Sequence, residues 1–254
     1  MRLLVDSGMI LPLLVILVWW WGSRSGWWSA FLLPGPHTVI KSFFSLAKSG
    51  ELLTHVTASL LRIAKGFTAS ALFALVIAFV CGLYRPILRQ IATLLEFLRH
   101  IPPMATIPML ILWFGIGEAS KLVIIVMATF FPIFLNTVQG LSQSDRRLIE
   151  VAESFGYSKV QTLRHVIIPG ALPYIFTGMR LGLGYSWRSL IAAELVAASS
   201  GLGYMILDAE QLSRPDVIMV GILVIGCLGS IIDLVFFRLS AHFSMYGSAN
   251  DAVV

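Results

Sequence analysis

Two arginines and a glutamate lie in one long apolar segment that begins at Pro169. As a helix, the segment would place Arg180 about 16 Å from Pro169, at about 1.5 Å per residue, and thus near the middle of a bilayer. Arg188 follows about two turns later, and Glu194 approaches the far end. A charge at such depth is costly and marks a functional site by default. We therefore predict a solute pathway in which Arg180 and Arg188 supply positive potential for an anion, with Glu194 and Ser186 on the same path.

The alternative for Arg180 is a structural ion pair with an acidic residue such as Glu96 or Glu194, which would hold two helices in register. Both interpretations remain open at this point. The same segment contains Gly178 and Gly182 in a G-x-x-x-G pair. This spacing predicts close contact with a neighbouring helix.

A short charged island, Asp145 to Arg164, separates two long apolar segments. Glu150 and Ala152 open its predicted helix, Gly156 follows, and Pro169 closes the block. An acidic first turn suits a helix N-terminus, and glycine permits a bend or a close approach by a partner. The island is typical of a structured polar element that a soluble partner pushes, and the alternative is a plain solvated loop.

Enzymatic chemistry is not indicated. The sequence contains no G-x-x-x-x-G-K-[ST] phosphate loop, so energy for uphill transport must come from another chain. Its histidines are dispersed, and no nucleophile stands in a recognisable motif, so we predict no metal site, cofactor or catalytic centre. Cys81 and Cys227 each lie inside an apolar run, and we predict two buried small hydrophobic residues without a disulfide.

The composition is that of a membrane protein. Of 254 residues, 57% are hydrophobic and 12% charged, with a mean hydropathy of +0.87. The net charge of +5 comes from scattered basic residues, which suits loops facing anionic lipid and not nucleic acid. The length predicts a single transmembrane domain, residues 1–254.

Apolar runs of about 20 residues are needed to cross ~30 Å of hydrocarbon as a helix. The sequence predicts an all-α, polytopic fold with six such spans, at about 4–21, 59–84, 91–116, 121–141, 169–198 and 217–237. The first span has a short apolar core, and a cleaved signal sequence is its alternative. The tryptophans at 19–21 form an interfacial belt and favour a retained span.

Nine basic residues on one side of these spans against seven on the other favour cytoplasmic N- and C-termini, with the loop 142–168 inside. Between the first two spans, an amphipathic stretch, residues 39–46, is expected along the outer membrane surface. Pro102 and Pro103 in the third span and Pro173 in the fifth predict bends, either as gating hinges or as static kinks.

The charged island resembles the cytoplasmic coupling loop of ABC importer permeases. That pattern reads E-A-A, three residues, G, nine residues, I-x-L-P, and Glu150, Ala152, Gly156 and Pro169 match it at the right spacing. The departures are conservative: Val151, Val166 and Ile168. Other segments resemble the nitrate/sulfonate/taurine branch of these permeases: L-P-G-P at 33–36, L-R-H-I-P-P at 98–103, W-F-G-I-G-E at 113–118, P-G-A-L-P at 169–173, A-A-E-L at 192–195 and G-L-G-Y at 201–204.

The resemblance implies a type I ABC importer permease fold in a bacterial inner membrane, in which Glu150, Ala152, Glu153, Gly156 and Pro169 belong to the ATPase-coupling loop. It implies a second copy of the permease, two ATPase subunits that bind ATP and Mg, and a periplasmic or lipid-anchored solute-binding protein. This chain would be the non-catalytic subunit.

The expected function is import of a small anion by alternating access, with aliphatic sulfonate or taurine favoured. Nitrate, bicarbonate and a thiamine-precursor pyrimidine remain open. A polar or apolar residue is expected at position 188 in the sulfonate and taurine relatives, so Arg188 favours a pathway role and a solute that differs from theirs. A secondary transporter or channel would show inverted repeats, and a membrane enzyme would show clustered titratable residues; neither signature is present.

Overall fold

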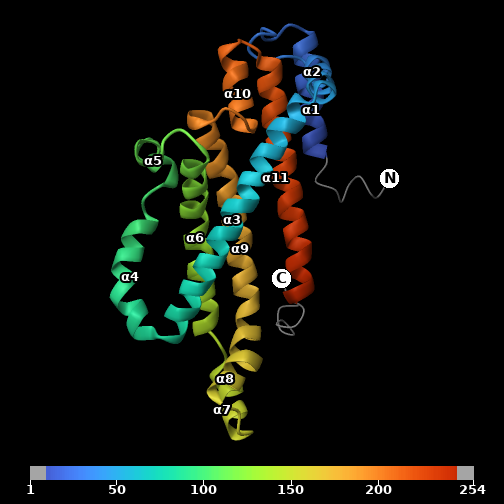
Figure 1. The fold of residues 1–254 in the computed structure, drawn as a ribbon. Helices are drawn as coiled ribbons and strands as arrows, with labels where there is room; N and C mark the ends of the chain where they lie inside the picture. Colours follow the sequence, from blue (N-terminus) through green and yellow to red (C-terminus); the bar gives the residue numbers. More distant parts are fainter. Residues whose placement is uncertain (1–9, 245–254) are drawn as a thin grey trace. The chain divides into compact units, whose positions relative to one another are not determined.

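The computed structural model describes residues 10–244, and every regular element in that range is a helix (Figure 1). This confirms the prediction of an all-α fold. The elements, with η2 a 3-10 helix and η3 a π-helix, are α1 Ile10–Arg24, α2 Pro36–Ser49, α3 Glu51–Leu83, α4 Arg85–Arg99, η2 Pro103–Thr106, α5 Ile107–Phe114, α6 Glu118–Ser142, α7 Arg146–Ser154, α8 Lys159–Thr162, η3 Leu163–Ile167, α9 Ile168–Ala197, α10 Leu202–Gln211 and α11 Pro215–Ser244.

Within residues 10–244, four stretches are long and apolar enough to cross a membrane: Glu51–Leu83, Glu118–Ser142, Lys159–Ala197 and Pro215–Ser240. α4 and the helical segment Pro103–Phe114 meet the same test only as a bent pair. α1 has 15 residues and is about 22 Å long, short of the ~30 Å of a bilayer core. The beginning of the predicted first span, residues 4–9, lies outside the described residues. The count of six spans therefore stays a prediction.

The predicted third span, residues 91–116, is not one continuous helix. α4 ends at Arg99, Pro102 is extended with φ −63° and ψ 126°, and the chain bends by 80° before it continues from Pro103. Proline lacks an N–H donor and disfavours a helical conformation in the residue before it. Two consecutive prolines therefore interrupt the helix, while their role in gating stays a prediction.

Helix contacts divide the described chain into two units, residues 10–59 with 199–227, and residues 60–198 with 228–244. α3 and α11 each continue from one unit into the other. A single domain covering residues 1–254 stays a prediction.

In the first unit, two side chains of α3 hold the start of α10. The Gly201 N–H donates to His55 Nδ1 at 3.1 Å, and the Leu202 N–H donates to Ser59 Oγ at 2.9 Å. His55 and Ser59 are four residues apart and therefore share one face of α3. The first N–H groups of a helix have no partner within it, so these contacts satisfy donors that burial would otherwise leave unpaired.

In the second unit, α6 and α9 pack closely through glycine. A Cβ added at Gly178 would lie 2.8 Å from the Pro132 carbonyl oxygen of α6, and one added at Gly182 would lie 3.0 Å from Thr129 Cγ2. The close contact predicted from the G-x-x-x-G spacing is confirmed. No atom lies within 4 Å of a Cβ added at Gly184, so this glycine is not required for packing.

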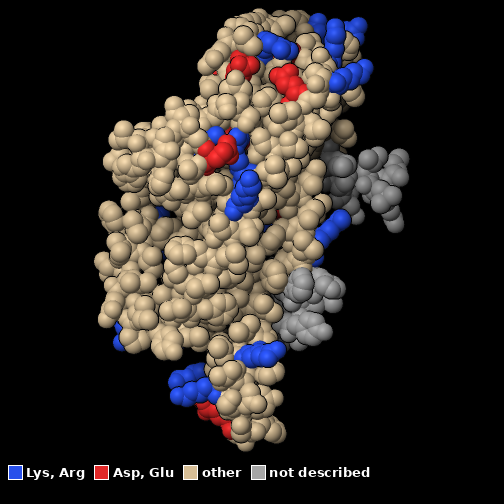
Figure 2. Space-filling model, viewed as in Figure 1, with Lys and Arg blue, Asp and Glu red and all other residues tan. Residues whose placement is uncertain are grey.

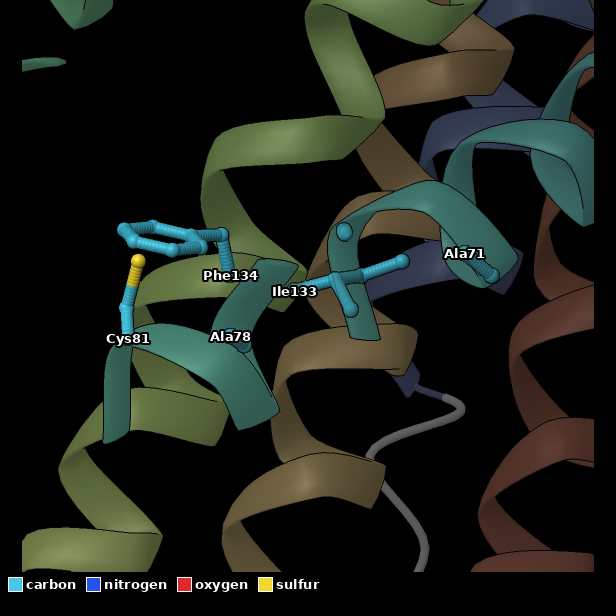
Figure 3. Close-up of a cluster of buried hydrophobic side chains, with 6 residues drawn as sticks. Ala71, Ala78, Cys81, Ile133 and Phe134 are labelled. Carbon is cyan, nitrogen blue, oxygen red and sulfur yellow. The ribbon is translucent and has the colours of Figure 1, made fainter. Parts of the chain in front are cut away.

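α3 packs on α6 through small side chains. Ala71, Ala74, Ala78 and Cys81 repeat along one face of α3 and form a buried cluster with Ile133 and Phe134 of α6 (Figure 3). In Figure 3 the Cys81 sulfur points toward the Phe134 ring, which confirms the prediction that this cysteine is a buried hydrophobic residue.

The corresponding prediction for Cys227 is wrong, since this residue is exposed on α11. α11 is largely apolar around Cys227, so its sequence carries only a weak periodicity to separate a buried from an exposed face.

Candidate functional site

The connection between α6 and α9 is a folded helical element, residues 145–167, which we call the α7–α8 element. Its first helix starts at Asp145, whose Oδ1 accepts a hydrogen bond from the Arg147 N–H at 2.9 Å. The expectation that Glu150 opens this helix is wrong. Asp145 provides the N-cap because its short side chain reaches the free N–H groups of the first turn, and Glu150 lies in the middle of α7.

Gly156 ends α7 in a Schellman motif. It has φ +79°, and the Tyr157 N–H donates to the Ala152 carbonyl at 3.0 Å while the Gly156 N–H donates to the Glu153 carbonyl at 2.9 Å. Only glycine adopts this left-handed conformation without steric cost, which gives the glycine of the sequence pattern a backbone role.

The chain then restarts at once as helix and leads into α9. Ser158 and Gln161 form a capping box at the start of α8, and five residues of π-helix, Leu163–Ile167, follow. Pro169 is the second residue of α9 and follows the π-helix without a break in the helical backbone, so a carbonyl of the preceding turn lacks the donor that another residue would supply. The α7–α8 element is therefore built rigidly onto α9.

Exposed apolar side chains surround this element. Leu148, Val151, Phe155 and Val160 are between 51% and 80% exposed, and α7 borders a groove of about 710 Å³ that Pro169 also lines. Figure 2 shows basic and acidic side chains at the lower tip, where Figure 1 places α7 and α8. Apolar groups rimmed by charges are typical of a protein interface.

Arg180 does not pair with Glu96 or Glu194. Its Nε and a terminal nitrogen donate to the two carboxylate oxygens of Asp233 on α11, at 2.8 and 2.7 Å. The guanidinium also lies 5.0 Å from the centre of the Phe237 ring. This bidentate pair neutralises most of the positive potential predicted for Arg180.

Arg188 lies on the same exposed face of α9. Its guanidinium lies 5.8 Å from the centre of the Tyr185 ring, and no carboxylate of residues 10–244 is within salt-bridge distance of it. Arg180, Arg188 and Asp233 border one groove of about 380 Å³ between α9 and α11. The structure thus brings the two predicted pathway arginines together.

Glu194 and Ser186 lie elsewhere and are fully buried. Ser186 Oγ donates to the Leu183 carbonyl of its own helix at 2.7 Å. Glu194 accepts a hydrogen bond from a terminal nitrogen of Arg62 at 2.7 Å. Their predicted place on the solute path stays a prediction.

Sequence reasoning did not find Arg62, which lies well inside α3 because this helix begins at Glu51. Besides Glu194, Arg62 binds both carboxylate oxygens of Glu118 at 2.8 Å, and Lys121 donates to Glu118 at 3.0 Å. We call these four residues the charge cluster. It joins α3, α6 and α9 at the end of α9 remote from the α7–α8 element, and its two positive and two negative charges balance.

Comparisons with known proteins place these features in a family. Residues 74–244 match the family described as binding-protein-dependent transport system inner membrane component. The chain is 40% identical over 224 residues to the putative aliphatic sulfonates transport permease protein SsuC of Escherichia coli (strain K12), covering 88% of this chain and 85% of that protein. It is 36% identical over 221 residues to the taurine transport system permease protein TauC of the same organism, covering 82% and 80%.

The bicarbonate transport system permease protein CmpB of Synechococcus elongatus is 33% identical over 246 residues, covering 89% of this chain and 86% of that protein. Among solved structures, a chain of the MetNI methionine ABC transporter in inward-facing conformations matches 74% of this chain and 96% of its own length, with a TM-score of 0.60 and 19% identity. This likeness confirms the type I ABC importer permease fold.

Proposed function

Because the chain belongs to the family of binding-protein-dependent transport system inner membrane components, and is thus a permease of the ABC importer class, we propose that it carries an organosulfonate into the cytoplasm. The relatives named for aliphatic sulfonates and taurine support this class of solute. The observation that carries the proposal is the 40% identity over 224 residues to a protein named for aliphatic sulfonates. Arg188 supports an anion of some kind, because it is a charge on an exposed face of a spanning helix and no carboxylate of residues 10–244 lies within salt-bridge distance of it. A guanidinium there attracts a permanent anion such as a sulfonate.

The α7–α8 element is the proposed contact with a cytosolic ATPase. Its exposed apolar residues supply the docking surface, Glu150 and Glu153 supply charge beside it, and Gly156 and Pro169 fix the direction in which α9 leaves the element. Ala152 is the buried residue of α7 and holds that helix against the rest of the element. The partner subunits, two per complex, would bind ATP and Mg and hydrolyse the nucleotide, and this chain would contribute no catalytic residue.

The exposed charged face of α9 supports a second copy of the chain as a partner. Arg180 and Arg188 lie within a membrane-spanning helix and are exposed, and a charge in that setting faces a protein neighbour or a water-filled path. In the proposed complex the two copies form one transmembrane domain each and enclose the path. The chain would lie in a bacterial inner membrane with both termini cytoplasmic, and a solute-binding protein would dock on the opposite side.

Transport then follows from differential contacts in two conformations. ATP closes the paired ATPases, the α7–α8 elements move with them, and the path opens outward; hydrolysis resets it. Pro102, Pro103 and Pro173 are the proposed positions at which helices bend during this change. Glu194 and Ser186, which are buried in this conformation, would reach the path only in the other one.

The test is ATPase activity of the permease co-expressed with its ATPase in lipid nanodiscs. Binding proteins loaded with an alkanesulfonate, taurine, nitrate, bicarbonate or a pyrimidine precursor are added in turn, and Phe155→Asp is the variant in the docking surface. We expect the sulfonate- or taurine-loaded binding protein to stimulate the ATPase activity, and we expect Phe155→Asp to abolish this stimulation. Stimulation by the bicarbonate-loaded protein alone would reassign the solute, and the absence of a stable complex with any ATPase would refute the importer subunit.

A further inference from the structure

A cavity of about 480 Å³ lies beside the break between α4 and η2. We call it the α4 cavity. Its volume falls in the range of about 300–1,000 Å³ that is usual for small-molecule sites. All of its walls belong to the second unit: Arg99, His100, Ile101 and Pro103 at the break, Met127, Ala128, Phe131, Pro132 and Leu135 on α6, and Leu181, Tyr185 and Ser189 on α9.

The break itself indicates a use for this space. Non-helical backbone at membrane depth is tolerated only where protein buries it or where it lines a cavity. In secondary transporters, discontinuous helices typically form the solute site, and we apply the same physical reasoning to the break in this permease. Here residues 100–102 interrupt the bent pair, and the α4 cavity lies directly beside them.

The lining combines a cation with an apolar wall. Arg99 binds Glu96 of its own helix at 3.0 Å, with side chains 42% and 66% exposed, and such an exposed pair is weak enough to exchange for another anion. On the other side, Met127, Phe131 and Leu181 offer apolar surface. A site of this kind fits a molecule with a carbon chain and an anionic head.

A basic stripe continues from the cavity along α4. Arg85, Arg89, Glu96 and Arg99 all lie within about 80° of one another on a helix of 3.6 residues per turn, so three positive charges and one negative charge share a face. A different face of α4, with Leu88, Ile91 and Leu95, packs on the α3–α6 core.

Arg85 and Arg89 border a second cavity, of about 380 Å³, which reaches Ser142 at the end of α6. The stripe therefore leads from the α4 cavity toward the end of the helices that carries the α7–α8 element.

We propose that the α4 cavity is a solute-binding site for organosulfonates, in which the Arg99 guanidinium binds the sulfonate and the wall of Met127, Phe131 and Leu181 contacts the carbon chain. The proposal rests on the proposed function and adds the place where the solute is held. A guanidinium matches the oxygens of a sulfonate with two parallel N–H donors, which lysine does not offer. Arg89 and Arg85 then attract the released anion toward the α7–α8 end.

The first experiment measures binding without the solute-binding protein. The permease–ATPase complex in phosphatidylcholine nanodiscs is titrated with 1-hexanesulfonate, and binding is followed by saturation-transfer NMR. Arg99→Gln should weaken binding by roughly 10- to 100-fold, the loss of one charge-assisted contact, and Arg99→Lys by less. The matched control is Arg24→Gln, an exposed arginine of α1 in the other unit, which should bind as the wild type does.

The second experiment measures transport per ATP hydrolysed at saturating loaded binding protein. Arg99→Gln should lower this ratio at least tenfold, and Leu181→Trp, which fills the cavity, should exclude hexanesulfonate more than methanesulfonate. Equal binding by wild type and Arg99→Gln would overturn the site, as would a phospholipid held there that hexanesulfonate does not displace. If hexanesulfonate binding depends on Arg99 but no loaded binding protein stimulates the ATPase, the site is supported and only the assignment as an importer subunit is refuted.

Discussion

Removing Arg62 should destabilise the second unit more than any other single loss of charge in the charge cluster. Its guanidinium is 6% exposed and donates to Glu194, whose side chain is 0% exposed, and to Glu118, whose side chain is 60% exposed. In Arg62→Leu, Glu194 loses this cation in a place that water does not reach. Breaking a buried pair in this way costs about 3–5 kcal/mol, while an exposed carboxylate such as Glu118 accounts for only about 0–1 kcal/mol.

The assay is the midpoint of thermal or denaturant unfolding of the purified permease–ATPase complex, compared across Arg62→Leu, Glu194→Leu, the double variant and Glu118→Gln. Each single change at the buried pair should lower the midpoint strongly. The double variant should recover most of the loss, because it removes both charges and leaves apolar side chains of similar volume. Glu118→Gln should stay within about 1 kcal/mol of the wild type. An Arg62→Leu protein as stable as the wild type, or a double variant no better than the singles, would refute the reasoning.

Changes at four further positions test the backbone of the α7–α8 element and of α9. Gly156→Ala should cost about 1 kcal/mol because φ is +79° and no atom is near the new methyl group, and Gly156→Asn should cost less; protease sensitivity of the α7–α8 element measures both. Asp145→Ala should lower the stability of α7 by about 0.5–2 kcal/mol through loss of the N-cap, and faster hydrogen exchange in α7 would measure this loss. Gly178→Ala should cost about 1–3 kcal/mol through contact with α6, whereas Gly184→Ala, with open space around it, should not lower the unfolding midpoint.

Local signals in the sequence were sufficient for a helix in the α7–α8 element, its end at Gly156 and the position of Pro169, because each depends on residues within a few positions of one another. The start of that helix was expected at Glu150, whereas its N-cap is Asp145. The close contact at Gly178 was also predictable, because two small residues four positions apart in a spanning helix let a neighbouring helix approach closely.

What the sequence left open depends on partners that are distant in the chain. The acidic partner of Arg180 is Asp233, 53 residues away, and Arg62 meets Glu194 across 132 residues. No periodicity specifies such pairs. The exposed position of Cys227 was missed for a related reason, since a largely apolar stretch of helix gives little sign of which of its faces is covered.

The ion pairs of α9 differ in strength: the pair near its C-terminal end is buried, and the pair near its middle is exposed. Glu194 is fixed to α3 and α6 through the buried Arg62, so that end of α9 moves only together with those helices. Arg180 is bound to α11 by a pair with side chains 42% and 53% exposed, which is easier to break. A push on the α7–α8 element, built onto the first turn of α9, should therefore carry α3, α6 and α9 as one body and separate α9 from α11.

We accordingly expect Arg180→Cys/Asp233→Cys, joined by a short bifunctional thiol reagent in a background with Cys81→Ala and Cys227→Ser, to block transport. The same double-cysteine protein before the reagent is added is the control and should retain transport. Transport that survives the cross-link would show that α9 and α11 do not separate during the cycle.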